Sequence, residues 1–185
     1  MAGNKRTVTD DKAIIRTLED NEEKGFRLLM EKYKEPVYWH IRRLVVNHLD
    51  AQDVVQEAFL RIFRSMRQYS GENSFKAWIF SIATNEALRL LGRRQGREML
   101  SLDDTTTALN LMGDEYFDYS RVEAVRLQKA ILTLPAKQQL AFNMRYYDDL
   151  SFKEIAAAID STEANVKANY HYAKEKIIKY MNSNN

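Results

Sequence analysis

The sequence predicts an all-α protein of two helical domains joined by a flexible acidic linker, the C-terminal domain containing a helix-turn-helix. The 185 residues include only two prolines and six glycines, and residues with high helix propensity are abundant. Apolar residues recur at helical spacing through two long stretches, and the stretch between them has no sustained period. We therefore expect domains at residues 1–97 and 120–185, separated by a linker at residues 98–119.

Five helices are predicted in the N-terminal domain, from their apolar stripes and from residues that favour helix ends. They are a helix near Asp11–Glu19, one near Glu22–Lys34, a third that starts at Pro36, a fourth capped by Asp50 and a fifth capped by Ser74. A polar loop at residues 68–73 precedes the fifth helix, which ends in a run of arginines.

Four helices are predicted in the C-terminal domain. Ser120 and Glu123 have the spacing of a capping box and open the first helix. The second helix starts after Pro135, and the dipeptide Asp148-Asp149 turns the chain into the last two helices. The preceding linker is rich in Asp, Thr, Asn and Gly, as loops and linkers are.

The most informative stretch is Leu150–Lys176, which predicts two short helices joined by a tight turn. Ser151 and Glu154 form a second capping box, and Ser161 or Thr162 can cap the second helix. The outward face of that second helix carries polar, small and basic residues: Ala164, Lys167, Ala168, His171 and Tyr172. A helix-turn-helix places such a face in the DNA major groove, although a helical hairpin whose polar face meets water has the same pattern.

The charge is distributed unevenly along the chain, although its formal net value is only +2. Residues 1–97 carry net charge +5, residues 98–124 carry −6 and residues 125–185 carry +3. Two mildly basic blocks around an acidic connector indicate polyanion-facing domains on a tether that avoids the polyanion. Chance clustering of surface charge is the alternative for the basic blocks.

Several classes of protein are disfavoured by composition. The chain has no cysteine, which excludes disulfides, thiolate metal sites and cysteine nucleophiles. No apolar run approaches the roughly 18 residues of a membrane span, and the N-terminus lacks the apolar core of a signal peptide. We expect a cytoplasmic protein.

Three segments resemble two conserved regions of bacterial sigma factors. The sequences DAQDVVQEAFLRIF (Asp50–Phe63) and SFKAWIFSIATNEAL (Ser74–Leu88) are similar to the second region, and Leu132–Lys167 is similar to the fourth. Only a short acidic linker separates them, which is typical of the extracytoplasmic-function (ECF) group. The resemblance covers most of Ile14–Ile178. It implies a transcription initiation factor that binds core RNA polymerase, directs it to specific promoters and helps to melt the DNA.

The resemblance also implies roles for particular residues. Core polymerase is expected to contact the polar face formed by Asp53, Gln56 and Glu57. At the downstream (−10) promoter element, capture of flipped bases is expected from Tyr69, Asn73, Lys76 and Asn85. Phosphate contacts there are expected from Arg89, Arg93, Arg94 and Arg97, because arginine pairs with the backbone of nucleic acids.

The upstream (−35) element is expected to contact the second helix of the helix-turn-helix. The contacting face is the outward one, formed by Ala164, Lys167, Ala168, His171 and Tyr172. Lysine can bond a guanine edge or a phosphate, and alanine can touch a thymine methyl. The sequence departs from the commoner family pattern, which often has Arg at the positions of Asn169 and Tyr172 and an Asp-Arg pair at Arg89-Leu90. For that reason no promoter sequence is transferred to this chain.

An enzyme is not expected. His40 and His48 are eight residues apart, which separates them by about 80° even on one helix, and no carboxylate has ligand spacing to them. Each is expected to be a surface or boundary histidine. The sequence has no glycine-rich phosphate loop and no nucleophile elbow. We expect no cofactor and no metal.

Two other functions fit parts of the sequence. The first is a stand-alone helix-turn-helix regulator that binds operator DNA without polymerase, usually as a dimer. The second is a non-DNA-binding adaptor or an anti-sigma-type interaction protein. Under the sigma-factor interpretation, the partners are core RNA polymerase and promoter DNA, with an anti-sigma factor as a further candidate and no membrane insertion.

Overall fold

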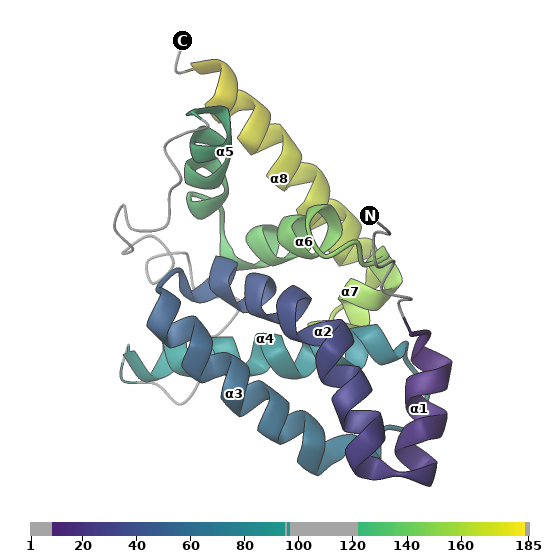
Figure 1. Cartoon of the computed structure of the whole chain (residues 1–185). Helices are drawn as coiled ribbons and strands as arrows, with labels where there is room; N and C mark the ends of the chain where they lie inside the picture. Colours follow the sequence, from purple (N-terminus) through teal and green to yellow (C-terminus); the bar gives the residue numbers. More distant parts are fainter. Residues whose placement is uncertain (1–8, 95, 97–121, 184–185) are drawn as a thin grey trace, which may run out of the picture.

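The computed structural model describes residues 9–94, 96 and 122–183, which contain α-helices and no strand (Figure 1). The N-terminal block contains α1 (Asp11–Asp20), α2 (Glu22–Val45), α3 (His48–Ser65) and α4 (Phe75–Arg94), with a short 3₁₀ helix at Met66–Gln68. The C-terminal block contains α5 (Val122–Leu132), α6 (Ala136–Tyr146), α7 (Phe152–Ala158) and α8 (Glu163–Ser183). The all-α class and the helix-turn-helix, α7–α8, are confirmed. The predicted linker and the Ser120 cap lie outside the described residues.

The predicted helix boundary at Pro36 is wrong, because α2 continues through it for 24 residues. Proline removes one backbone hydrogen bond and crowds the carbonyl four residues earlier, which bends a helix without always ending it. Figure 1 shows α2 changing direction along its length. The bend lets the first part of α2 pack on α1 while its last part faces the C-terminal block.

Helix α1 is held on α2 by a polar contact and by a close backbone approach. The Asp11 carboxylate accepts hydrogen bonds from Lys32 Nζ (2.7 Å) and from the Tyr33 hydroxyl (2.8 Å). Burial, together with the hydrogen bond to Asp11, raises the pKa of Tyr33, so this hydroxyl stays a donor. Gly25 supplies the close approach, because a Cβ there would lie 2.5 Å from the backbone nitrogen of Leu18.

Local end signals mostly predict where the other helices start. The Ser74 oxygen accepts from Ala77 N–H, and the Ser151–Glu154 capping box is complete, so both predicted caps are confirmed. Thr162 caps α8 by accepting from Asn165 N–H. The cap predicted at Asp50 is wrong, since α3 starts earlier and the Asn47 side chain accepts from Asp50 N–H.

One apolar cluster runs through both blocks. It joins residues of α2 and α4, among them Ile41, Ile79 and Phe80, to Met144 and Ile155 of the C-terminal block. Helix α7 packs on α4, and α6 approaches α2 (Figure 1). A second, smaller cluster joins α5, α6 and α8. No described helix is both long and apolar enough to cross a membrane.

Candidate nucleic-acid interface

The outward face of α8 is solvent-exposed, as the sequence predicts. Its five candidate residues are all exposed: Ala164, Lys167, Ala168, His171 and Tyr172. The opposite face is anchored in the block by Val166, Ala173 and Ile177, which are buried. Lys167 Nζ lies 2.7 Å from the Glu163 carboxylate, one turn earlier. This exposed face, carried on a buried stripe, is the arrangement that lets a helix enter a major groove.

Three of the base-capture candidates gather at the start of α4. The Tyr69 hydroxyl donates to the Asn73 carbonyl (2.7 Å), which fixes the loop, and the Tyr69 ring lies 5.3 Å from the rings of Phe75 and Trp78. Lys76 lies on the first turn of α4. Burial, together with the charge of Asp11, raises the pKa of Tyr69, so its ring is neutral and suited to stacking on a base.

Two cavities flank Tyr69, and no pattern in the sequence predicts either of them. The larger, of about 450 Å³, lies between α1 and the 3₁₀ helix and is lined by Leu18, Met66 and Phe75 among others. The smaller, of about 100 Å³, is lined by Asn73, Trp78 and other residues of this region, and also by Ala157 of α7. Tyr69 contributes to the walls of both cavities.

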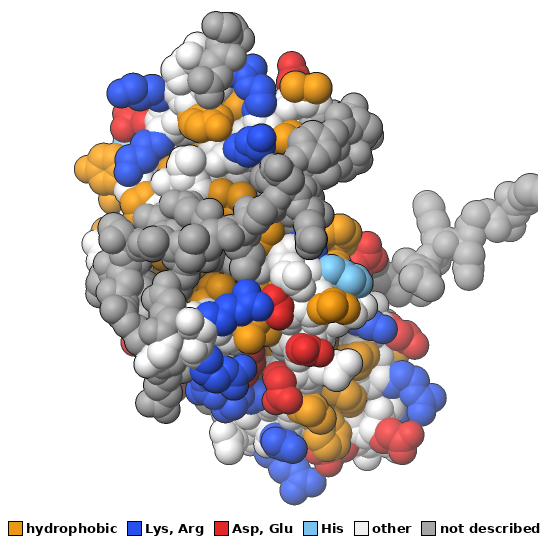
Figure 2. Space-filling view, turned by 90° about the vertical axis from the view of Figure 1, so that its left-hand side faces the viewer, with side chains coloured by type: hydrophobic (Ala, Val, Ile, Leu, Met, Phe, Trp, Pro, Cys, Tyr) orange, Lys and Arg blue, Asp and Glu red, His pale blue; other side chains and the backbone are white. Residues whose placement is uncertain are grey.

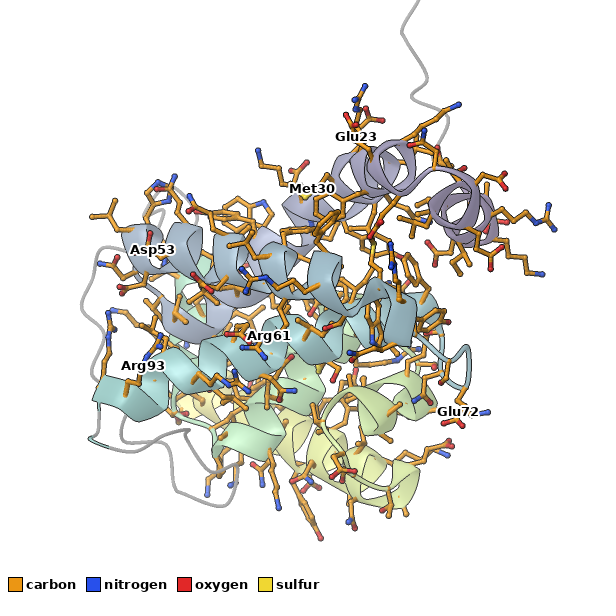
Figure 3. All side chains as sticks on the ribbon, turned by 90° about the horizontal axis from the view of Figure 1, so that it is seen from below. Glu23, Met30, Asp53, Arg61, Glu72 and Arg93 are labelled. Carbon is orange, nitrogen blue, oxygen red and sulfur yellow. The ribbon has the colours of Figure 1, made fainter. Side chains whose placement is uncertain are left out.

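The arginine candidates do not join that group. Arg93 lies 17 residues after Lys76 on the same helix, a separation of about 25 Å along the axis. Figure 3 shows Arg93 at the same end of the α3–α4 pair as Asp53, with Glu72 of the loop at the other end. Asn85 is exposed between the two groups. Arg97 lies outside the described residues.

Several of the candidate cations are already paired within the chain. Arg94 forms an ion pair with Asp50, and Arg89 lies 3.5 Å from the buried Glu86 carboxylate, which also pairs with Arg61. Arg93 forms no ion pair within the described part of the chain. Figure 2 shows basic and acidic side chains interspersed over the described surface on its face, rather than gathered by sign. Phosphate binding by Arg89 or Arg94 therefore has to exchange an existing ion pair for a new one.

The three candidate polymerase contacts share one exposed face of α3. Asp53, Gln56 and Glu57 are exposed, and Gln56 and Glu57 follow Asp53 by three and four residues, so both are its neighbours on the helix. Within residues 9–94, neither acid forms an ion pair. Leu60, 47% exposed, continues the same face. An acidic face with an exposed apolar residue is suited to contact with another protein.

The expectation that His40 is a surface or boundary histidine is wrong, because its side chain is 1% exposed. It lies on α2 where the two blocks meet, and its Nδ1 is 2.7 Å from the Asp148 carboxylate. The expectation holds for His48, which is exposed and hydrogen-bonds Tyr38. Asp148 was predicted only as a turn residue, and its contact with His40 spans 108 positions of the sequence.

Comparisons with known proteins find two conserved sigma-factor regions in this chain. Residues 29–97 match the family model of sigma-70 region 2, and residues 124–177 match that of sigma-70 region 4. The ECF RNA polymerase sigma-E factor of Escherichia coli K12 is 31% identical over 177 residues, 90% of this chain and 92% of that protein. The sigma-E factor of Haemophilus influenzae is 29% identical over 178 residues, 90% of this chain and 93% of that protein.

Solved structures are similar in fold. CnrH, in complex with the cytosolic domain of CnrY, aligns with a TM-score of 0.70 at 15% identity, covering 95% of this chain and 99% of that one. The sigma factor RpoE of Bartonella quintana, in complex with the anti-sigma factor NepR, aligns with a TM-score of 0.64 at 19% identity, covering 88% and 99%. The matches in sequence, over nearly the whole length of both chains, show that this chain belongs to the ECF sigma factors of bacterial RNA polymerase.

Proposed function

We propose that this protein directs core RNA polymerase to specific promoters and initiates transcription there, performing no chemical step itself. The observation that carries the proposal is that region 2 and region 4 both match, in order, in one chain. The exposed faces of α3 and α8 add two separate surfaces, one suited to protein and one to DNA. Its partners are then core polymerase and promoter DNA.

Each domain has its own part in this proposal. Residues 1–97 act as sigma region 2, which binds core polymerase and handles the downstream element. Residues 120–185 act as sigma region 4, which reads the upstream element. Residues 98–119 connect the two as an acidic linker.

At the downstream element, the proposed task is to capture melted DNA. Unpaired bases stack on aromatic rings, and each such contact is worth about 1–3 kcal/mol. Tyr69 supplies the ring, while Asn73 and Lys76 supply polar groups beside it. Asn85, Arg89, Arg93 and Arg94 follow along α4, so a strand captured at Tyr69 extends over about 25 Å of helix toward the arginines.

At the upstream element, the proposed task is duplex recognition. The exposed face of α8 enters the major groove, where Lys167 meets a guanine edge or a phosphate and Ala164 and Ala168 allow close approach. His171 and Tyr172 lie further along the same face. Binding releases Lys167 from Glu163, which lies at the first turn of α8.

We also propose an anti-sigma protein as a partner of the free chain. The support is similarity in fold to CnrH and to the Bartonella RpoE, two proteins solved in complexes, the second with an anti-sigma factor. Such a partner would copurify with the free chain and be displaced by core polymerase.

The polymerase contact is tested by charge reversal on α3. The variant D53K/E57K should lower affinity for core polymerase at least tenfold, because it places two cations where the wild type presents two acids. The matched control is E31K/E35K, with the same spacing on exposed positions of α2. Affinity is measured by titrating labelled protein with core polymerase. Equal affinity of D53K/E57K and the control would contradict the assignment of this face.

The interpretation as a stand-alone regulator predicts a different result when DNA binding is measured with and without core polymerase. Such a protein would bind a specific duplex by itself, and core polymerase would not change that binding. The adaptor interpretation predicts no dependence of any activity on Lys167 or Arg93.

A further inference from the structure

Two arginines share one buried carboxylate between α3 and α4. The Glu86 side chain, on α4, is 8% exposed. Arg61 of α3 forms an ion pair with its Oε1 through Nε, and Arg89 Nη1, one turn further along α4, lies 3.5 Å from the same oxygen. Figure 3 shows Arg61 reaching from α3 toward α4. We refer to Arg61, Glu86 and Arg89 as the Glu86 cluster.

The Glu86 carboxylate has to keep a cationic partner, because it is buried in the α3–α4 pair. Ala83, one turn earlier on the same face of α4, is fully buried. A buried charge without a partner is strongly destabilising, because it interacts neither with water nor with a cation. One arginine is enough to neutralise this carboxylate. The second arginine therefore gives the Glu86 cluster a net charge of +1.

The two arginines differ in how closely they are held. Their side chains are similarly accessible, at 48% for Arg61 and 41% for Arg89, but Arg61 makes the closer contact. Glu86 Oε1 accepts no well-directed hydrogen bond from the residues that the structure describes, so both contacts are held mainly by charge. Arg89 is thus the arginine that can leave the carboxylate while Arg61 stays.

The other ion pair between these two helices has no spare cation. Arg94 pairs with Asp50, and within the described part of the chain Asp50 has no second basic partner. If Arg94 moved to a DNA phosphate, Asp50 would lose its partner. If Arg89 moved, Glu86 would keep Arg61. Arg89 can therefore exchange its partner without leaving a carboxylate unpaired.

Arg89 also lies on the path proposed for the DNA strand along α4. Arg93 follows it by four residues, so the two are neighbours on the helix, and Arg93 is exposed. A strand that follows α4 meets both side chains. Arg61 comes from α3, one turn after Glu57 of the proposed polymerase face. Its connection to the strand is through Glu86.

We propose that Arg61 and Glu86 are positioning residues for Arg89. Glu86 holds Arg89 at the surface of α4 in the free protein, and Arg61 keeps the carboxylate neutral when Arg89 moves to a DNA phosphate. The inference rests on the function proposed above. Without Arg61, Arg89 would be the only partner of a buried charge and would stay with Glu86 instead of binding DNA.

The test measures how the affinity of the holoenzyme for a promoter depends on salt in R61Q and R89Q. The probe is a promoter fragment mapped with the wild type. Each phosphate contact contributes about 0.9 to the salt slope on duplex DNA and about 0.7 on a single strand. R61Q and R89Q should each lose one contact. Between about 50 mM and about 200 mM salt, their affinity should therefore fall about threefold less than that of the wild type.

The double variant R61Q/R89Q separates positioning from a direct contact by Arg61. If Arg61 acts only through Arg89, the double variant should have the same salt slope as R89Q. Loss of a second contact would show that Arg61 binds a phosphate itself, and would overturn the proposal.

R64Q is the matched control for charge. Arg64 is exposed on α3, one turn after Arg61, and forms no ion pair within the described part of the chain. R64Q removes the same charge as R61Q from a nearby position, and its salt slope should match that of the wild type. An equal change in R64Q and R61Q would mean that the slope follows net charge, which would contradict the role of Glu86.

The variant R61Q/E86Q tests the part of the carboxylate. Removing Glu86 together with Arg61 releases Arg89, so the wild-type slope should return, and adding R89Q should lower it again by one contact. If R61Q does not unfold cooperatively, this variant replaces it. A slope in R61Q/E86Q that is lower than that of the wild type by one contact would overturn the proposal.

Two further outcomes count against the proposal. An unchanged salt slope in folded R61Q would overturn it, and so would a loss of affinity of R61Q for core polymerase, since that would place Arg61 in the polymerase contact. Failure of the wild type to transcribe with core polymerase would refute the proposed function instead. That failure is seen before any variant is compared, so the two results are distinguishable.

Discussion

Lys167 lies beside Glu163 on the exposed face of α8, so contact with DNA would replace an existing ion pair. Replacing it with glutamine should weaken holoenzyme binding to an upstream element by about 1–3 kcal/mol if it reads a base, or lower the salt slope by about 1 if it meets a phosphate. Promoter occupancy is measured over a range of salt concentrations. K176Q, about 180° around α8 from Lys167, is the control. Identical behaviour of the two variants would remove Lys167 from the interface.

Glu154 gives a prediction about pH. Burial alone would raise the pKa of this carboxyl, but hydrogen bonds from Ser151 N–H and from the Ser74 and Ser151 hydroxyls, with the charge of Lys76, outweigh it and lower the pKa below 4.5. A lowered pKa stabilises the fold above the unfolded-state pKa, and that stability is lost as pH falls through the folded-state pKa.

The expected result follows from that sign. E154Q should be less stable than the wild type at pH 7, by about 0.5 kcal/mol because solvent screens a half-exposed cap. The difference should shrink as pH falls below about 4.5. Urea unfolding at pH 7 and pH 4 measures it, with E35Q as an exposed control. A difference that is the same at both pH values would show that the charge of Glu154 is not its stabilising feature.

Residues differ in how far the sequence reveals their role. The Ser151–Glu154 capping box and the exposed face of α8 depend on spacings of three to eight residues, so the sequence predicts both. The Asp148 contact with His40 depends on how two blocks pack, and no local pattern marks it. For that reason the sequence does not predict that His40 is buried against Asp148.

The extent of helix α2 is likewise not predicted by the sequence, because it depends on how the helix packs. Its apolar stripe continues on both sides of Pro36, but proline is also common at the first turn of a helix, and the sequence does not distinguish the two cases. Packing decides between them: one part of α2 supports α1, and the other carries His40 and Arg43 to the C-terminal block. The sequence predicts the ends of α3 and α4 to within a few residues, because the apolar stripes of these two helices are uninterrupted.

The α1–α2 pair gives a stability prediction. In G25A, a Cβ would meet the backbone of Leu18 at 2.5–2.6 Å, so α1 must shift away. Alanine favours a helix over glycine by about 1 kcal/mol, but the backbone clash should outweigh this and leave a net destabilisation of about 1–3 kcal/mol. Thermal unfolding measures it, with E35A on the same helix as control. An increase in Tm for G25A would contradict the close approach of α1.

In the whole molecule, the two blocks that the sequence separates share one apolar cluster. The uneven charge along the chain indicates two polyanion-facing domains. In the structure, Arg89, Arg94 and Lys167 each form an ion pair within the chain. DNA binding by these residues would therefore replace an internal carboxylate partner, and net charge does not describe this exchange.

The most direct test of this account is transcription in a reconstituted system. Core polymerase from the source bacterium, this protein and a fragmented library of the genome are combined, and transcript 5′ ends are mapped. The account predicts start sites that appear only when both proteins are present and that share two upstream sequence elements. No such start sites, together with specific duplex binding by the protein alone, would contradict it.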